Sequence, residues 1–285
     1  MPESPPETGL AILAGGGTMP ARVSEAALAL GRRIFVIGLE GNADPEVLAP
    51  YPHAFAPIGA VGRIRALLGV NGCQEVVMVG AMQRPSIFEL RPDVEGMRLL
   101  ARLGWAAFGG DDGLLTAITR ILGEEGFRVV GAHEIMNEVL APEGLLTRRA
   151  PDDLAVSDIR RGIAVVQALG AADVGQCCVV QQGLVLAVEA AEGTDAMLAR
   201  AGALARPGPG GVLVKLVKPG QERRADLPTI GPATIENAIK ASLRGLAIEA
   251  GGTMIAERQR TIDQADTSGL FIIGVDPDAL LGGDS

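Results

Sequence analysis

Aromatic residues are scarce in this chain, at 3% of 285 residues with a single tryptophan and a single tyrosine. Its hydrophobic cores must therefore be built from Ala, Val, Ile and Leu. Histidine is scarce as well, because only His53 and His133 are present. Two histidines far apart in the sequence make a histidine-based hydrolase a poor fit. They are also too few for a histidine-rich two-metal site.

Cysteine is limited to Cys73, Cys177 and Cys178, which offer neither a CxxC spacing nor an even disulfide framework. The adjacent pair lies in an apolar stretch that is typical of strand packing in a reducing compartment. No apolar run reaches the ~18 residues of a membrane span. The first eight residues are acidic rather than basic, which disfavours a signal peptide. We therefore expect a soluble, cytoplasmic protein.

Clustered positive charge is also missing, and the net charge is −9. Proteins that bind nucleic-acid backbones usually present a basic face, so a nucleic-acid partner is not expected. The largest basic cluster, Arg148-Arg149, is followed by a proline and two aspartates, as in a solvated linker.

The chain has a large apolar content, 48%, and enough length for two domains that each bury a core. Its first half alternates short strands that are apolar on both faces with helices, which is the pattern of a parallel α/β sheet. The expected strands are 10–14, 34–37, 75–79 and 127–130, and the expected helices are 21–30, 61–68 and 114–125. We thus predict a Rossmann-like domain over residues 1–140.

A Pro-rich polar stretch then predicts a linker over 141–155, followed by a mixed α/β catalytic domain over 156–285. Here the pattern predicts a hairpin of 179–180 with 184–188 and strands at 211–217 and 269–275. It predicts helices at 157–169, 195–205 and 233–250. The strand order of this domain is not derivable from the sequence.

Gly15-Gly16-Gly17 lies where the first strand passes into the first helix. Bare glycines let a backbone approach a phosphate, and a helix N-terminus favours an anion. The dinucleotide fingerprint is only partly met, because Pro20 stands where its third glycine belongs. A nucleotide or nucleotide-sugar site, a structural turn and a nicotinamide site all remain open. Arg84 and Asp111 follow at similar turns, where phosphate binding competes with helix capping.

Charged residues cluster in the second half. Glu189 directly follows an apolar strand and is the best candidate for an inward-facing ligand, whereas Glu192 and Asp195 suit a surface and a helix cap. Lys215 and Lys218 are three residues apart on or just past a strand. Because successive side chains of a strand point to opposite faces, we expect at most one of the two to point inward. Glu222 and Asp226 are four apart in a Gly/Pro-bounded loop, within reach of one cation.

These residue types suit a Mg²⁺-dependent phosphate enzyme, with Mn²⁺ as the alternative ion. Hard carboxylate oxygens bind the metal, and Lys or Arg holds phosphate oxygens. A carboxylate orients or deprotonates the attacking water. We expect Glu189, Glu222 and Asp226 as metal ligands and Asp226, Glu222 and Lys215 as catalytic residues, but which carboxylate does which job cannot be read from spacing. The expected substrate-binding residues are Gly15, Gly16, Gly17, Arg84, Asp111, Gln176, Lys218, Arg224 and Thr229.

Taken in order, these segments resemble the LpxI family of UDP-2,3-diacylglucosamine pyrophosphatases of the bacterial lipid A pathway. The resemblance runs from Leu10 to Val275 and rests on short motifs. They are Ala14-Gly15-Gly16-Gly17 with Pro20, Arg84-Pro85-Ser86, Gly110-Asp111-Asp112, Asp173-Val174-Gly175-Gln176, Glu189-Ala190, Glu192-Gly193-Thr194-Asp195, Lys215, Lys218, Gln221, Arg224 and Asp226-Leu227-Pro228-Thr229-Ile230-Gly231-Pro232.

The resemblance implies hydrolysis of UDP-2,3-diacylglucosamine to UMP and 2,3-diacylglucosamine 1-phosphate (lipid X) with a divalent cation. It implies attack by water on the sugar-side phosphorus, a substrate site between the two domains and an essential Asp226. It also implies transient contact with the inner-membrane surface. Gln83 and Glu222 depart from the family pattern, which usually has a basic residue and an aspartate there. A homodimer stays open, because no interface can be read from the sequence.

Other functions remain open on the residues alone. A different nucleotide-sugar pyrophosphatase or a sugar-phosphate transferase would use the same groups on a soluble substrate. A nucleotide-sugar or lipid-binding protein without turnover is the alternative from another class, and an NAD-linked oxidoreductase is the third.

Overall fold

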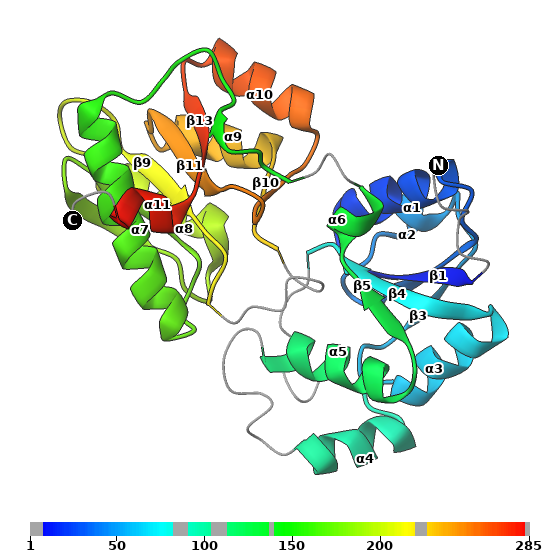
Figure 1. Cartoon of the computed structure of the whole chain (residues 1–285). Coiled ribbons are helices and arrows are strands. Elements are labelled where there is room, and N and C mark those ends of the chain that lie inside the picture. The colour runs from blue at the N-terminus through cyan, green and yellow to red at the C-terminus, as the bar shows by residue number, and fades with distance from the viewer. Residues whose placement is uncertain (1–7, 82–90, 104–112, 137–139, 220–226, 283–285) are drawn as a thin grey trace. The chain divides into compact units, whose positions relative to one another are not determined.

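The computed structural model describes residues 8–81, 91–103, 113–136, 140–219 and 227–282. The chain divides into two compact units, with the described residues up to 136 in the first and those from 140 onward in the second. The predicted strands at 10–14, 34–37, 75–79 and 127–130 are all present. The two units are built separately, each around its own sheet (Figure 1).

The first unit is a five-stranded parallel sheet in the order β3-β2-β1-β4-β5, the order of a doubly wound α/β sheet. Its helices lie on both faces of the sheet (Figure 1). The strands are β1 Gly9–Ala14, β2 Ile34–Leu39, β3 His53–Ala56, β4 Cys73–Val79 and β5 Arg128–Val130. The helices are α1 Met19–Ala29, α2 Pro45–Leu48, α3 Val61–Val70, α4 Val94–Leu103, α5 Gly113–Glu124 and α6 Ala132–Ile135.

Burial on both faces explains why these strands are continuously apolar. All six residues of β1 are buried. Ala11 and Leu13 face one core, in which Leu68 of α3 and Leu122 of α5 cover the sheet. Alternate residues of β1 point to the opposite face, which packs against α1.

The second unit is built on a six-stranded mixed sheet in the order β6-β13-β11-β9-β7-β8, with β10 and β12 as a separate parallel pair. The strands are β6 Gly144–Leu145, β7 Cys177–Gln181, β8 Leu184–Val188, β9 Val212–Lys215, β10 Thr229–Ile230, β11 Gly245–Glu249, β12 Met254–Ile255 and β13 Phe271–Val275. The helices are α7 Asp153–Ala171, α8 Gly193–Ala203, α9 Pro232–Lys240, α10 Arg258–Thr267 and α11 Pro277–Gly282.

Two apolar cores enclose this sheet from its two faces. On one face Ile159 and Ile163 of α7 pack against alternate residues of β7, β9 and β11. On the other face α8, α9 and α10 contribute Met197, Ile235 and Ala265. The predicted hairpin is the antiparallel pair β7 and β8. The mixed α/β character of this unit is therefore confirmed.

The stretch that we expected to be a linker, 141–155, is built into the second unit. β6 pairs antiparallel with β13, and Ala141 donates its N–H to Thr253 O at 2.8 Å. Asp152 begins α7 as its N-cap and accepts from Ala155 N at 2.8 Å. The second unit thus includes the residues from 140 onward and leaves no separate linker at 141–155.

The predicted helix at 233–250 is wrong, because α9 ends at Lys240 and residues 245–249 form β11. Ser242 takes a left-handed φ of 57° after the helix. Its N–H bonds to Ile239 O at 2.9 Å, and Leu243 N bonds to Ala238 O at 3.0 Å. This pair of bonds is a Schellman ending, which usually carries a glycine where this chain has serine.

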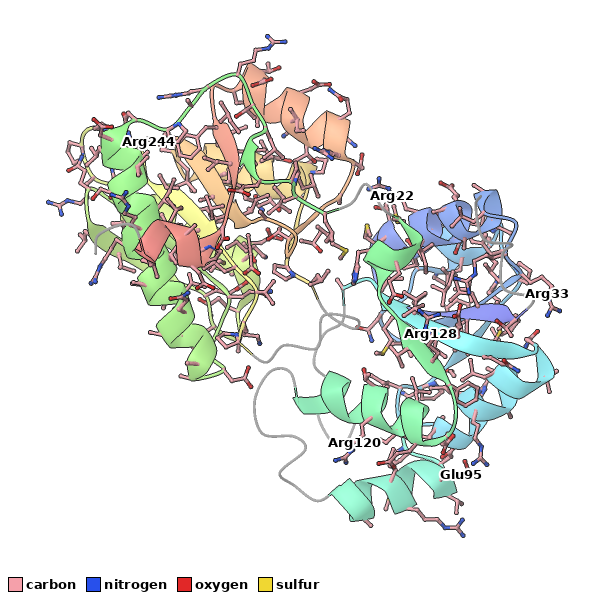
Figure 2. All side chains as sticks on the ribbon, in the orientation of Figure 1. Arg22, Arg33, Glu95, Arg120, Arg128 and Arg244 are labelled. Carbon is pink, nitrogen blue, oxygen red and sulfur yellow. The ribbon has the colours of Figure 1, made fainter. Side chains whose placement is uncertain are left out.

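A buried charged cluster holds α7 against the β7–β8 turn. Asp158 accepts from the N–H groups of Gln182 and Gly183 at 3.1 and 2.7 Å. Arg244 lies 3.8 Å from Asp158 and 2.9 Å from Asp152 (Figure 2). Asp158 and Arg244 are both buried, and they lie at the end of β7 and β8 opposite to Gln176 and Glu189.

Candidate functional site

The predicted site residues are only partly described. Arg84, Asp111, Glu222, Arg224 and Asp226 lie outside the described residues. The described ones are Gly15, Gly16, Gly17, Gln176, Glu189, Lys215, Lys218 and Thr229. The three glycines belong to the first unit and the other five residues to the second.

The glycine loop lies at the carboxyl end of β1, beside the residues that follow β4. Gly15 donates its N–H to Val79 O at 2.8 Å, and Gly16 donates to Ala81 O at 2.7 Å. A Cβ on Gly15 would lie 2.5 Å from Ala81 O, so this close approach of two chain segments requires glycine. Gly15 and Gly16 therefore serve a structural contact, and their N–H groups are already used.

Gly17 differs from its two neighbours. Its φ is +83°, and a Cβ placed on it would meet no atom of the described residues within 4 Å. It is exposed and directly precedes Thr18, the N-cap of α1. Of the three glycines, Gly17 is thus the one with open space beside a helix N-terminus, where an anion is favoured.

The polar residues of the second unit gather at one edge of its large sheet. β8 and β9 both run antiparallel to β7, and β9 runs parallel to β11. Glu189 after β8, Lys215 at the end of β9 and Glu249 at the end of β11 therefore share an edge. Gln176, which precedes the opposed strand β7, lies at the same edge.

A buried hydrogen-bonded network joins three of these elements. Lys215 Nζ donates to Thr194 Oγ1 at 2.8 Å, and Thr194 Oγ1 donates to Glu189 Oε1 at 2.6 Å. The other carboxylate oxygen of Glu189 accepts from Gln176 N at 3.2 Å. Lys215 and Glu189 are 5% and 6% exposed, so one hydroxyl links two opposite charges in a region of low dielectric.

Cys177 faces this network from β7, opposite Lys215 in the strand register. Burial raises the pKa of the Cys177 thiol well above its usual range, although the nearby Lys215 ammonium opposes that shift. Cys178, on the other face, has its pKa raised to about 12 by burial. Both thiols therefore stay protonated at neutral pH and act as packing residues, as the sequence predicted.

Lys218 forms a second buried cation at this edge. Its Nζ lies 3.1 Å from Asp173 Oδ1, and the residue is 3% exposed. Asp173 precedes β7 and takes a left-handed φ of 51°. Our expectation that at most one of Lys215 and Lys218 points inward is wrong, because both are buried. β9 ends at Lys215, so strand alternation does not extend to residue 218.

The remaining predicted residues take separate positions. Thr229 is in β10, where its hydroxyl donates to Leu227 O at 3.2 Å. Glu192, the N-cap residue of α8, has its pKa lowered by a hydrogen bond from its own backbone N–H and by its ion pair with Arg200. Asp195 accepts from Asn237 Nδ2 at 2.8 Å. Glu192 and Asp195 thus have surface and structural partners, in contrast to the inward-facing Glu189.

Sequence reasoning missed Thr194 and Glu249. Thr194 was visible in the Glu-Gly-Thr-Asp motif, but a small hydroxyl residue carries no periodic signal of burial. Glu249 accepts from Val217 N at 2.9 Å and so fixes the segment between Lys215 and Lys218. It was overlooked because residues 233–250 were interpreted as one helix.

The described residues contain no group of three or more His, Cys, Asp or Glu side chains that could hold a metal ion. Of the three expected ligands only Glu189 is among them, and both of its oxygens already accept hydrogen bonds. In this part of the chain the donors do not fit a complete magnesium site. Glu189 is placed to orient Thr194 and Lys215 instead.

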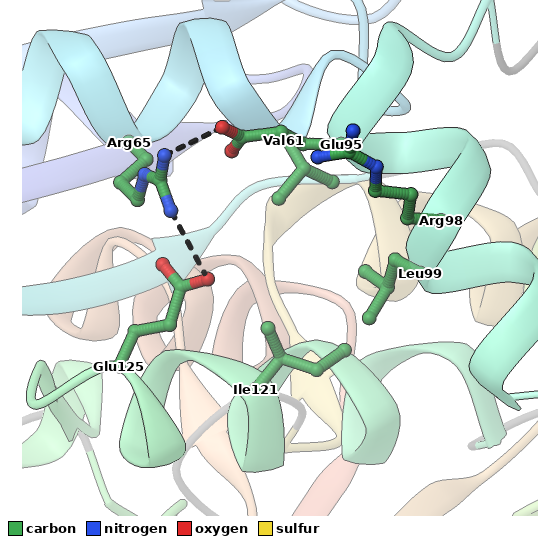
Figure 3. A pocket seen from close by; sticks show the side chains of 7 residues that line it. All are labelled: Val61, Arg65, Glu95, Arg98, Leu99, Ile121 and Glu125. Atoms are coloured by element: carbon green, nitrogen blue, oxygen red, sulfur yellow. Dashed lines mark hydrogen bonds and ion pairs between the residues drawn. The ribbon is translucent and has the colours of Figure 1, made fainter.

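A cavity of about 250 Å³ lies elsewhere in the first unit, among α3, α4 and α5 (Figure 3). It is lined by Val61, Arg65, Glu95, Arg98, Leu99, Ile121 and Glu125. Arg65 lies 2.5 Å from Glu95 and 3.8 Å from Glu125. Since four of the seven lining residues are charged, this cavity does not suit an acyl chain. No helix in the described ranges is long and apolar enough to span a membrane.

Two domain models of one family match nearly the whole chain. Residues 9–139 match the LpxI N-terminal domain, and residues 142–273 match the LpxI C-terminal domain. The UDP-2,3-diacylglucosamine pyrophosphatase LpxI of Caulobacter vibrioides (strain ATCC 19089 / CIP 103742 / CB 15) is 43% identical over 274 residues. These cover 94% of this chain and 98% of that protein.

Two solved structures show weak likeness. CobK precorrin-6A reductase is 15% identical, covers 94% of this chain and 87% of its own, and has a TM-score of 0.31. N5-carboxyaminoimidazole synthase from Aspergillus clavatus is 13% identical, with 62% and 39% coverage and a TM-score of 0.22. At such scores neither structure carries an argument. The sequence matches over both units do, and this chain belongs to the LpxI family.

Proposed function

We propose that this chain hydrolyses the pyrophosphate of UDP-2,3-diacylglucosamine to UMP and 2,3-diacylglucosamine 1-phosphate, a step of lipid A biosynthesis. The observation that carries the proposal is the 43% identity, over nearly all of both chains, to a UDP-2,3-diacylglucosamine pyrophosphatase. The protein acts in the cytoplasm and meets its diacylated substrate at the surface of the inner membrane.

The edge of the second sheet supports this chemistry. Pyrophosphate hydrolysis needs cations to neutralise charge on the phosphate oxygens while water bonds to phosphorus and the bridging oxygen leaves. Lys215 and Lys218 supply two buried ammonium groups near the end of β9. Thr194 and Glu189 hold the first in place, and Asp173 pairs with the second. Buried cations with fixed partners need little reorganisation when negative charge develops nearby.

Asp226 and Glu222 are proposed to supply the remaining carboxylates, with Asp226 essential. A divalent ion, Mg²⁺ with Mn²⁺ as its substitute, would neutralise pyrophosphate oxygens when bound. Glu189, being buried and doubly hydrogen-bonded, serves as a positioning residue in this proposal. Substrate contacts are assigned to Arg84, Asp111, Gln176, Arg224, Thr229 and, in the glycine loop, Gly17.

Phosphorus NMR of UDP-2,3-diacylglucosamine, incubated with the protein and Mg²⁺ in ¹⁸O-labelled water, tests the proposal. The expected products are UMP and 2,3-diacylglucosamine 1-phosphate, with the label in the sugar phosphate because water attacks that phosphorus. Asp226→Ala is the matched control, and we expect it to lose turnover while keeping the wild-type circular dichroism spectrum. A wild-type protein that cleaves nothing with either Mg²⁺ or Mn²⁺ would refute the proposed activity.

A further inference from the structure

Arg22 and His133 each bury a nitrogen atom, Nη1 of Arg22 and Nδ1 of His133, that has no hydrogen-bond partner among the described residues. Leaving a buried donor unpaired is costly, and more so when the group is charged. Arg32 and Arg244 also bury an unpaired nitrogen, but Glu75 and Asp152 neutralise these two guanidinium groups. Among the described carboxylates none forms an ion pair with Arg22.

Both residues lie at the carboxyl edge of the first sheet, where α/β sheets of this type bind ligands. α1 begins after β1, α6 begins after β5, and the two helices contact each other. Figure 2 shows Arg22 where α1 lies beside α6. Tyr51 occupies another flank of α1, where its hydroxyl donates to Ala21 O at 3.3 Å. α1, which carries Arg22, thus has α6, which carries His133, as a neighbour.

α6 is held by hydrogen bonds to Glu134, which do not involve Nδ1 of His133. Gly131 donates its N–H to Glu134 Oε1 at 2.8 Å, and Arg128 Nη2 donates to Glu134 Oε2 at 2.9 Å. A Cβ on Gly131 would lie 2.3 Å from His133 Cε1, so glycine makes room for the imidazole ring. α6 is thus anchored by Glu134 rather than by His133.

The start of α1 has the features that suit an anion. Thr18, its N-cap, makes no side-chain cap hydrogen bond, and its first turn holds no acidic residue. The exposed Gly17 leaves open space beside it. The partial positive charge of a helix N-terminus adds to the charge of Arg22, one turn along the helix.

We propose that Arg22 and His133, beside the N-terminus of α1, form a binding subsite for a phosphate group of the substrate. Nη1 of Arg22 then donates to a phosphate oxygen, and Nδ1 of His133 donates to another when it carries the ring proton. This subsite rests on the proposed function, because a nucleotide sugar supplies the phosphate. Without a bound phosphate, the two buried and unpaired nitrogens destabilise the folded protein.

Arg22→Met and His133→Phe test the subsite by thermal unfolding, each with and without UMP, glucosamine 1-phosphate or inorganic phosphate. Removing an unpaired buried donor should leave the unfolding temperature of the ligand-free protein unchanged or raised. The rise in unfolding temperature caused by UMP or by the sugar phosphate should shrink, because a phosphate contact is lost. For the substrate we expect KM to increase about tenfold or more, with a smaller change in kcat.

Arg32→Met is the matched control, because Arg32 is paired with buried Glu75. It should lower the unfolding temperature and leave the response to phosphates intact. If the Arg22→Met variant keeps the wild-type KM and still shows the rises in unfolding temperature caused by UMP and by glucosamine 1-phosphate, the subsite is wrong. The proposed function would still stand. A wild-type protein without turnover whose UMP response still depends on Arg22 would retain the subsite and refute the activity. The ligand whose response is lost identifies the phosphate that is bound.

Discussion

Thr194 shows how a single hydroxyl can control a buried cation. It accepts from Lys215 and donates to Glu189, and neither charged group is accessible to bulk water. A hydrogen bond to a charged group contributes roughly 1.5–3 kcal/mol, and removing it from a buried pair leaves both partners unsatisfied. The position of the Lys215 ammonium therefore depends on a neutral neighbour.

Thr194→Val keeps the shape of the side chain and removes the hydroxyl. We expect kcat to fall at least about tenfold with a smaller change in KM, because the mispositioned Lys215 no longer stabilises developing charge. Thr194→Ser, which restores the hydroxyl, should recover most of the activity. Steady-state kinetics on both variants measure this. Equal losses for Val and Ser would show that Thr194 acts through packing alone.

Gly15 is predicted to be needed for packing. A Cβ there would lie 2.5 and 2.9 Å from the carbonyl oxygens of Ala81 and Gly80, which are backbone atoms. Gly15→Ala should therefore lower the free energy of unfolding by about 1–3 kcal/mol. Gly69→Ala, in α3 where a Cβ meets no atom of the described segments within 4 Å, should raise it by about 0.5–1 kcal/mol. Urea denaturation compares the two variants, and a neutral Gly15→Ala would contradict the steric argument.

At the residue scale, the sequence predicted which side chains face inward better than it predicted their hydrogen-bond partners. Glu189 was expected to face inward because it directly follows an apolar strand, and it is buried. The prediction that Lys215 and Lys218 point to opposite faces was wrong, because it assumed that the strand continues beyond Lys215. Thr194 had no pattern from which to find it, since its position beside Glu189 and Lys215 depends on α8 packing against β7 and β8.

At the scale of elements, propensity located most strands and helices but misplaced some ends. α7 begins at Asp153 rather than at 157, because Asp152 caps it. α9 and β11 were merged because residues 243–249 are apolar enough for either element, and because Ser242 stands at the helix end where a glycine is usual. Gly245 was a usable signal, since a Cβ there would lie 2.4 Å from the Phe271 ring.

The cap of α7 predicts a pH dependence of stability. The hydrogen bond from Ala155 N lowers the pKa of Asp152 below its usual 3.8, and the Arg244 charge adds to this against partial burial. A carboxyl group whose pKa is lowered on folding stabilises the protein above its unfolded-state pKa. That contribution is lost as the pH falls through the lowered folded-state pKa.

Asp152→Asn keeps a capping oxygen and removes the charge, so it isolates this effect. We expect the wild type to have the higher unfolding temperature at pH 7, with the difference disappearing as the pH falls below about 4. Thermal unfolding followed by circular dichroism from pH 7 to pH 3 measures it. Asp153→Asn, exposed in the same first turn, is the control and should show a smaller difference. A difference that stays constant down to pH 3 would contradict the assignment.

For the whole molecule, the sequence predicted two α/β domains but not the strand order of the second. In the first unit, β1, β2 and β3 are neighbours in both sequence and space. In the second unit, β9 and β11 are neighbours although about thirty residues separate them, and β13 lies between β11 and β6. Such pairings depend on how helices cover both faces of the sheet, which local patterns do not encode.

The separate cores predict how the molecule responds to a cavity. Leu213 is fully buried in a core drawn only from the second unit, and Leu68 is fully buried in a core drawn only from the first. Replacing either leucine by alanine should cost about 2–5 kcal/mol. Hydrogen exchange followed by mass spectrometry should show lost protection in peptides of the mutated unit, with the other unit unchanged. Equal loss in both units from either variant would mean that the chain unfolds as one cooperative body.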